Sequence, residues 1–301
     1  MRTSEDAKRC RATLYTAGLC LSAVLLAGCG EPTHNSNISP DIANAPLHDQ
    51  LPTDIKSSGE IRYAAGSGYP PFGYMDKDGK THIGLDVDLV EALSKQLGVR
   101  FIWIDLTGAF ATAIPSLQSR KNDLVIAGME NTEDRRKVVD FVDYLQANDA
   151  IFVKGSNKNE VKDDLDICGK TIAVATGNSG PLAYLATLSK KCSGAGKPAP
   201  EVKVIDRLPA IVAGVQSGQL YGGSTGLPAA LYTSEATKGA VAVVARQRDA
   251  GTIGIAVSKD RPELKEAVRK AMQNIMHSGE YQKLLEKWKL WDLRIDARQI
   301  K

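Results

Sequence analysis

The chain has 301 residues, of which 43% are hydrophobic and 24% charged, and this composition is typical of a globular protein long enough for two domains. It contains 38 Lys and Arg against 35 Asp and Glu, so it lacks the basic excess that binding to nucleic acid requires. The four His are not clustered with Cys at ligand spacing, which argues against a metal site, and we expect no cofactor.

The N-terminus predicts export. Four basic residues precede an apolar stretch, Leu14 to Ala27, that is short for a membrane span, although a transmembrane anchor is the alternative. The stretch ends in Leu26-Ala27-Gly28-Cys29, which resembles the bacterial lipoprotein signal. We therefore expect a signal peptide at 1–28 and lipidation of Cys29, which would anchor the protein to the outer face of the cell membrane. The mature chain would carry 34 Lys and Arg against 33 Asp and Glu.

Two cysteines remain in the mature domain. Cys10 and Cys20 leave with the signal peptide and Cys29 carries the lipid, so Cys168 and Cys192 form one pair in an oxidising compartment. This predicts a disulfide, with two buried free thiols as the alternative.

The segment that follows the lipidation site is rich in Pro, Asn, Ser and Asp and shows no apolar periodicity. We expect residues 29–58 to form a flexible tether.

The folded part begins with strands and helices in alternation. Strands are predicted at 62–65, 99–105 and 123–127, and helices at 86–97, with Asp86 as its cap, and at about 109–120. This spacing predicts an α/β fold with a mostly parallel sheet that has helices on both faces. Ligands of such sheets bind at the carboxyl ends of the strands.

The alternation restarts after Asn148 and continues to about residue 245. One more strand, 252–257, and two helices follow, which are too few elements for a third domain. We expect them to return to the first domain. The predicted lobes are therefore 59–146 plus 251–301, and 147–250.

The stretch from Gly128 to Arg135 is the predicted ligand clamp. Thr132 is suited to cap a short helix, and the acidic residues Glu133 and Asp134 suit the positive end of its dipole. Arg135 would then project from the first turn beside the end of a strand, where its planar fork can hold a carboxylate by two hydrogen bonds. Taken alone, these residues favour the alternative that Arg135 is a solvated charge among charged neighbours.

Several motifs carry a resemblance to a known family. They are Gly84-Leu85-Asp86-Val87-Asp88-Leu89, the segment 123–129, Thr132 to Arg135, Val139-Asp140-Phe141, and Gly279-Glu280-Tyr281 with Lys287-Trp288. Together they resemble the bacterial extracellular solute-binding proteins of family 3, the polar amino acid receptors of ABC importers. The resemblance implies a two-lobed, type II periplasmic-binding-protein-like fold with the ligand in the interlobe cleft.

The resemblance also implies roles for individual residues. Arg135 would bind the α-carboxylate of the ligand, together with the turn at 177–180. This turn opens a helix, so its backbone N–H groups, including those of Asn178 and Ser179, and the Ser179 hydroxyl would converge on the same anion. A plain helix cap is the alternative for Ser179. Tyr69 and Phe110 would sandwich the ligand side chain, with core packing as the alternative. The Gly128 carbonyl would help to receive an ammonium group.

One position departs from the family. Gly226 stands where the family has an aspartate for the α-ammonium, whereas Glu130 stands where Ser or Thr is usual. Either Glu130 supplies the missing carboxylate from the other side of the cleft, or the ligand has no α-ammonium.

The sequence thus predicts a monomeric substrate-binding lipoprotein that delivers a small zwitterion, a polar amino acid or a similar solute, to an ABC permease by hinge closure. We expect no catalytic residue. The alternative is an enzyme similar to periplasmic cyclohexadienyl dehydratases, with Glu130 as a general acid of raised pKa. The sequence leaves the identity of the ligand open.

Overall fold

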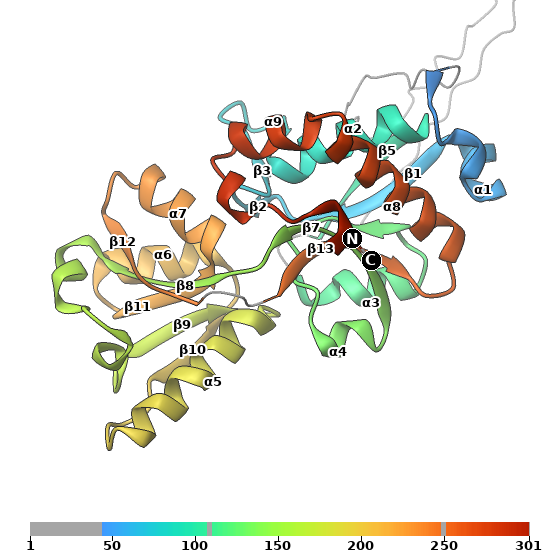
Figure 1. Ribbon diagram of the computed structural model, residues 1–301. Helices are drawn as coiled ribbons and strands as arrows, with labels where there is room; N and C mark the ends of the chain where they lie inside the picture. Colours follow the sequence, from blue (N-terminus) through green and yellow to red (C-terminus); the bar gives the residue numbers. More distant parts are fainter. Residues whose placement is uncertain (1–43, 107–109, 248–250, 301) are drawn as a thin grey trace, which may run out of the picture. The chain divides into compact units, whose positions relative to one another are not determined.

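The computed structural model describes residues 44–106, 110–247 and 251–300 (Figure 1). The predicted signal peptide at 1–28 and the predicted lipidation site Cys29 lie outside these ranges. Within them, no helix combines the length and the apolar character needed to cross a membrane.

The first sheet has five strands in the order β5-β1-β6-β13-β7 (Figure 1). These strands are β1 (Glu60–Ala65), β5 (Arg100–Asp105), β6 (Leu124–Val125), β7 (Val139–Gln146) and β13 (Thr252–Ser258). Alternate residues of a strand face opposite sides, so Tyr63 joins one apolar cluster and Ala64 the other. The associated helices are α2 (Leu85–Leu97), α3 (Ala113–Gln118), α8 (Pro262–His277) and α9 (Glu280–Lys287).

The second sheet has the order β10-β9-β11-β8-β12. Its strands are β8 (Asp149–Lys154), β9 (Thr171–Ala175), β10 (Glu201–Ile205), β11 (Gly222–Gly226) and β12 (Val241–Arg246). The helices α5 (Ser179–Gly194), α6 (Leu208–Ser217) and α7 (Leu227–Ala236) contact it (Figure 1). A small sheet of β2 (Gly68–Tyr69), β3 (Gly73–Met75) and β4 (His82–Ile83) holds Tyr69.

The predicted α/β class with two helix-flanked mixed sheets is confirmed. Parallel pairing is less dominant than expected, because each sheet has two parallel and two antiparallel pairings in the described part of the chain. The antiparallel pairings all involve β8 or β13, the strands by which the chain enters the second sheet and returns to the first. The lobe boundaries at 59–146 plus 251–301 and at 147–250 stay predictions.

The prediction of a flexible tether as far as residue 58 is wrong for residues 44–58. The helix α1 (Thr53–Ser58) forms there, and Leu47, Leu51 and Ile55 are buried in the same apolar cluster as α2. The Leu47 N–H also donates to the Gln96 carbonyl oxygen at 3.1 Å. The three apolar residues recur at every fourth position, a helical spacing that the polar composition of the segment obscures.

Asp86 is not the cap that the sequence predicts. The helix α2 begins at Leu85, after Gly84, and the Asp86 side chain is buried. Its Oδ2 accepts a hydrogen bond from the Gly128 N–H at 2.8 Å, and its Oδ1 accepts one from the Tyr144 hydroxyl at 2.7 Å. Burial raises the pKa of Asp86 to about 7, against the lowering effect of these two hydrogen bonds. This carboxyl group therefore joins α2 to the clamp turn and to β7.

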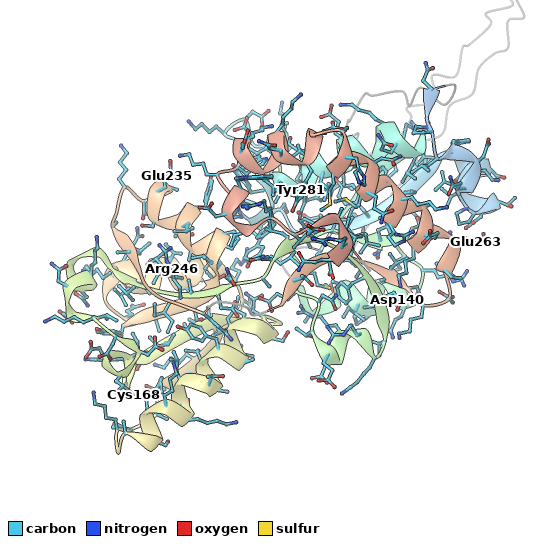
Figure 2. All side chains as sticks on the ribbon, in the orientation of Figure 1. Asp140, Cys168, Glu235, Arg246, Glu263 and Tyr281 are labelled. Atoms are coloured by element: carbon cyan, nitrogen blue, oxygen red, sulfur yellow. A yellow bond between two sulfur atoms is a disulfide. The ribbon has the colours of Figure 1, made fainter. Side chains whose placement is uncertain are left out.

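The predicted disulfide is confirmed: Cys168 and Cys192 are bonded, with their Cα atoms 5.6 Å apart. Cys168 (labelled in Figure 2) follows a short helix, η5 (Asp164–Ile167), and Cys192 is buried near the end of α5. The bond ties the far end of α5 to the segment that precedes β9.

Replacing Asp86 tests its structural role. We expect Asp86→Ala to lower the free energy of unfolding by about 2–4 kcal/mol, because it leaves the Gly128 N–H and the Tyr144 hydroxyl buried without an acceptor. Tyr144→Phe removes one of the two bonds and should cost about 1 kcal/mol. Urea unfolding followed by circular dichroism measures both, and an Asp86→Ala protein as stable as the parent would contradict this role.

The disulfide should contribute about 3 kcal/mol of stability by restricting the unfolded chain, since its cysteines are 24 positions apart. The test compares guanidinium unfolding of the parent with that of the Cys168→Ala/Cys192→Ala double variant. Thiol labelling of the denatured, unreduced mature domain is the control, and two reactive sulfurs there would show that the bond is absent in solution.

Candidate ligand-binding site

The predicted clamp forms as expected at its start. Thr132 caps α4 (Glu133–Arg136), and its Oγ1 accepts a hydrogen bond from the Arg135 N–H at 3.4 Å. The Arg135 guanidinium is not a solvated charge. It donates to the Glu130 carbonyl oxygen at 2.9 Å and to the Gly177 carbonyl oxygen at 3.1 Å. Burial lowers the pKa of Arg135, and the nearby Glu130 carboxyl group opposes this shift.

Arg135 borders a cavity of about 480 Å³, a size suited to a small ligand. Residues that contribute polar atoms or an aromatic ring to its lining include Phe110, Glu130, Arg135, Asp149, Gly177, Ser179 and Gly180. A second cavity of about 390 Å³ shares Phe110 with the first and is lined also by Tyr69, Asp105, Asn178, Asp206 and Arg207. The lining of both cavities thus comes from segments associated with both large sheets.

The turn before α5 already holds an anionic group of the protein. Asn178 is the N-cap residue of α5 but makes no side-chain cap hydrogen bond, and Ser179 is the first helical residue. The Gly180 N–H is within hydrogen-bonding reach of the Glu130 carboxylate, and a Cβ at Gly180 would overlap that carboxylate. In this structure the Glu130 carboxyl group thus occupies the helix N-terminus, and the predicted contact of Asn178 and Ser179 with a ligand carboxylate stays a prediction.

The two predicted aromatic residues occupy different surroundings. Phe110 lies in the short helix η3 (Phe110–Thr112), and the Arg135 guanidinium carbon is 5.3 Å from the centre of its ring. The Tyr69 ring stacks on Phe72 with centroids 5.4 Å apart, and its hydroxyl is 3.5 Å from the Thr225 Oγ1. Both residues border the second cavity, so their predicted contact with a ligand side chain stays a prediction.

The backbone conformation of Gly128 and its contact with Phe72 leave no room for a side chain. Its φ is +59°, and a Cβ there would approach the Phe72 ring to 2.8 Å, so this left-handed turn requires glycine. Its N–H is bonded to Asp86. Among the described residues that line the two cavities, Gly128 does not occur, and the role of its carbonyl oxygen stays a prediction.

Sequence reasoning missed Asp149. This residue opens β8, is 1% exposed, and lines the first cavity beside Glu130. Burial is the main cause of its raised pKa, and the adjacent Glu130 carboxylate adds to the shift. Burial likewise raises the pKa of Glu130, which Arg135 opposes. The available signal was one carboxylate at the start of an apolar strand, directly after the predicted crossing between lobes.

Comparison with known proteins identifies chains of similar sequence and structure. An ancestral arginine-binding protein bound to arginine is 35% identical in sequence, with a TM-score of 0.68 over 76% of this chain and 98% of that chain. An ancestral amino-acid-binding protein, a precursor of cyclohexadienyl dehydratase, is 31% identical, with a TM-score of 0.67 over 78% and 97% of the two chains. The arginine-binding protein ArgT of Corynebacterium glutamicum is 24% identical over 96% of this chain and 95% of its own length.

The family model of the bacterial extracellular solute-binding proteins, family 3, matches residues 61–290. This range includes all of both large sheets except Glu60, the first residue of β1, and every described residue that lines the two cavities. The chain therefore belongs to the bacterial extracellular solute-binding proteins of family 3.

Proposed function

We propose that this protein is the receptor of an ABC importer and binds an α-amino acid in the cavity beside Arg135. The observation that carries the proposal is the pairing, in one cavity, of the half-buried Arg135 guanidinium with two carboxyl groups, those of the half-buried Glu130 and the buried Asp149. An amino acid presents one group of each charge and matches this arrangement. L-Arginine is the first ligand to test, because it is bound by the ancestral relative described above.

Arg135 is the proposed partner of the α-carboxylate. Its present acceptors, the carbonyl oxygens of Glu130 and Gly177, are neutral, and a carboxylate forms stronger charge-assisted hydrogen bonds with a guanidinium. The Asn178–Ser179 turn at the N-terminus of α5 supports the same anion, and Glu130, which occupies that N-terminus in this structure, turns to the ligand ammonium.

The second cavity is the proposed place of the ligand side chain. Tyr69 and Phe110 supply aromatic surface there, and Asp105 and Asp206 supply carboxylates against the single guanidinium of Arg207. This composition suits a long side chain with a cationic end, since such a chain can pack its stem on the rings.

Hinge closure is the proposed working motion. The chain passes between the predicted lobes near Ala147 and again near Gly251, and the Ala147 N–H donates to the Gly251 carbonyl oxygen at 2.9 Å. A ligand held by Arg135 on one lobe and by the α5 turn on the other stabilises the closed state through its differential affinity. The permease would then recognise the closed receptor, which acts as a monomer.

The proposal assigns no catalytic residue. Two observations support the enzyme alternative. One relative is an ancestral precursor of cyclohexadienyl dehydratase, and burial raises the pKa of Glu130, as a general acid requires. However, the described carboxyl groups of the cavity face a guanidinium and a helix N-terminus, which is the arrangement that holds a zwitterion.

Export and anchoring are also proposed. The apolar stretch at 14–27 and the Leu26-Ala27-Gly28-Cys29 motif support cleavage before Cys29 and its lipidation. Residues 30–43 then separate the lipidation site, along the chain, from the described residues that begin at 44. Lipid attachment would keep the receptor at the outer face of the membrane, beside its permease.

Replacement of Arg135 tests the proposed function. We expect Arg135→Ala to weaken the binding of L-arginine by at least about 2 kcal/mol, because the α-carboxylate loses its charged partner in a buried site. Arg135→Lys should restore only part of the loss, since an ammonium lacks the planar fork. Isothermal titration calorimetry gives the affinities after a thermal-shift screen of the twenty amino acids has confirmed the ligand.

Arg136→Ala is the matched control for this experiment. It removes the same charge from the adjacent, exposed position, whose guanidinium donates to Asn131 and not to the cavity, so binding should stay close to that of the parent. If no amino acid binds, or if Arg135→Ala binds as tightly as the parent, the proposed function is wrong.

Replacement of Cys29 tests the anchor. We expect Cys29→Ser to release the protein from the membrane fraction without changing ligand affinity, because the attachment point precedes the folded residues. Cell fractionation and mass spectrometry of the N-terminus measure this. Cys20→Ser, inside the predicted signal peptide, is the control and should leave anchoring intact. A Cys29→Ser protein that remained in the membrane fraction after signal cleavage would exclude a lipid anchor at this position.

A further inference from the structure

Asp149 differs from the other buried carboxyl groups of the protein. Asp86 is equally buried, and the fold provides it with two hydrogen-bond donors, the Gly128 N–H and the Tyr144 hydroxyl. Both oxygens of Asp149 are buried, yet no N–H or hydroxyl of the described residues donates to either of them. A buried carboxylate without donors costs folding free energy, and a ligand that donates hydrogen bonds to it offsets that cost.

The surroundings of Asp149 indicate what is missing. Its side chain meets the Glu130 carboxyl group, with which it forms a hydrogen bond only when one of the two carries a proton. The other ionisable groups that face this pair are the Arg135 guanidinium and the phenols of Tyr69 and Tyr184. Of these groups only Arg135 is cationic, and its donors are directed at the carbonyl oxygens of Glu130 and Gly177.

The position of Asp149 in the sheet places it at the end of β8 that borders the cavity. In the pairing of β8 with β11, Asp149 stands opposite Gly226. Gly226 has no side chain, and the Tyr69 hydroxyl lies 3.0 Å from the place where its Cβ would be. Asp149 also lines the cavity that contains Arg135. A group that completes this site must carry positive charge and several N–H donors, as an ammonium does.

We infer that Asp149 is the principal partner of the α-ammonium of the ligand and shares that ammonium with Glu130. The inference rests on the proposed function, because it assigns one end of the amino acid to these two side chains. Arg135 holds the other end. Asp149 therefore selects for ligands that have an α-ammonium over otherwise equal carboxylic acids.

The pair also links binding to pH. In the empty site the two carboxyl groups share a proton, and the pKa of Asp149 is raised to about 8. An ammonium beside the pair favours its ionised form, so binding lowers this pKa and releases protons at neutral pH. The affinity of the parent protein should therefore rise from pH 6 to pH 8, a range in which the ligand ammonium keeps its charge.

The test combines a change in the protein with a change in the ligand. L-Arginine is compared with 5-guanidinopentanoic acid, which has the same carboxylate and guanidinium but no α-ammonium. By calorimetry, the parent should bind L-arginine at least about 30-fold more tightly than this analogue. In Asp149→Asn the preference should fall to within a few-fold, and the rise in affinity from pH 6 to pH 8 should disappear. If the screen identifies another amino acid, that compound and its desamino analogue replace this pair.

Glu263→Gln is the matched control. It removes a carboxylate from an exposed position in the first turn of α8, which does not line either cavity, and it should keep both the preference and the pH dependence of the parent. Thermal unfolding of each variant verifies that it is folded, and the comparison of ligands in the parent needs no variant at all. A parent protein that binds L-arginine and the analogue equally well overturns the inference.

The remaining outcomes are also decisive. An Asp149→Asn protein that is folded and keeps the full preference for L-arginine shows that Asp149 does not hold the ammonium, while binding itself leaves the proposed function intact. If Glu130→Gln loses the preference for L-arginine and Asp149→Asn keeps it, the ammonium is assigned to Glu130, and Asp149 is excluded as its principal partner. The absence of binding by any amino acid overturns the proposed function and this inference together.

Discussion

The buried Asp86 carboxyl group is the constraint on which the geometry of the site depends. It fixes the left-handed turn at Gly128, which directs the following residues towards the cavity, and it fixes Tyr144 on β7. The Tyr144 carbonyl oxygen in turn accepts a hydrogen bond from the Tyr281 hydroxyl at 2.8 Å, and that hydroxyl accepts one from the Ile295 N–H (Tyr281 is labelled in Figure 2). One chain of buried hydrogen bonds thus links α2, the clamp, β7 and the C-terminal segment.

The cavity shows the opposite use of buried charge. The fold provides donors to both oxygens of Asp86, whereas Arg135 has neutral acceptors and Asp149 has no donor among the described residues. Keeping these groups away from water costs desolvation free energy when no ligand is bound. A ligand of matching charge offsets this cost. A ligand with a carboxylate and an ammonium is then favoured, because it supplies the charged partners that Arg135 and Asp149 lack among the described residues.

Local sequence patterns predicted the features that depend on neighbouring residues. The Thr132 cap, the placement of Arg135 in the first turn of α4, the turn before α5 and the restart of strand and helix after Asn148 all follow from residues close together in the chain. The Cys168–Cys192 bond followed from the export signal and the count of remaining cysteines. Composition alone failed for residues 44–58, where three regularly spaced apolar side chains outweigh many polar ones.

The roles of Asp86 and Asp149 depend instead on contacts between distant segments. Asp86 reaches a turn 42 positions away in the chain, and no local pattern distinguishes this from helix capping. Asp149 acquires its surroundings from α5, from the clamp and from the opposite strand β11, so its importance is visible only when the sheet order and register are known.

Position 226 leaves little room for a side chain. A Cβ at Gly226 would stand 3.0 Å from the Tyr69 hydroxyl, so this hydroxyl would have to move slightly to admit an aspartate there. Asp149, directly opposite on β8, approaches the same end of the two strands without displacing Tyr69. The Glu130 carboxylate in turn occupies the space that a side chain at Gly180 would fill. The two glycines and the two acidic residues therefore form one consistent set, in which the space left by each glycine accommodates a neighbouring polar side chain that the cavity uses.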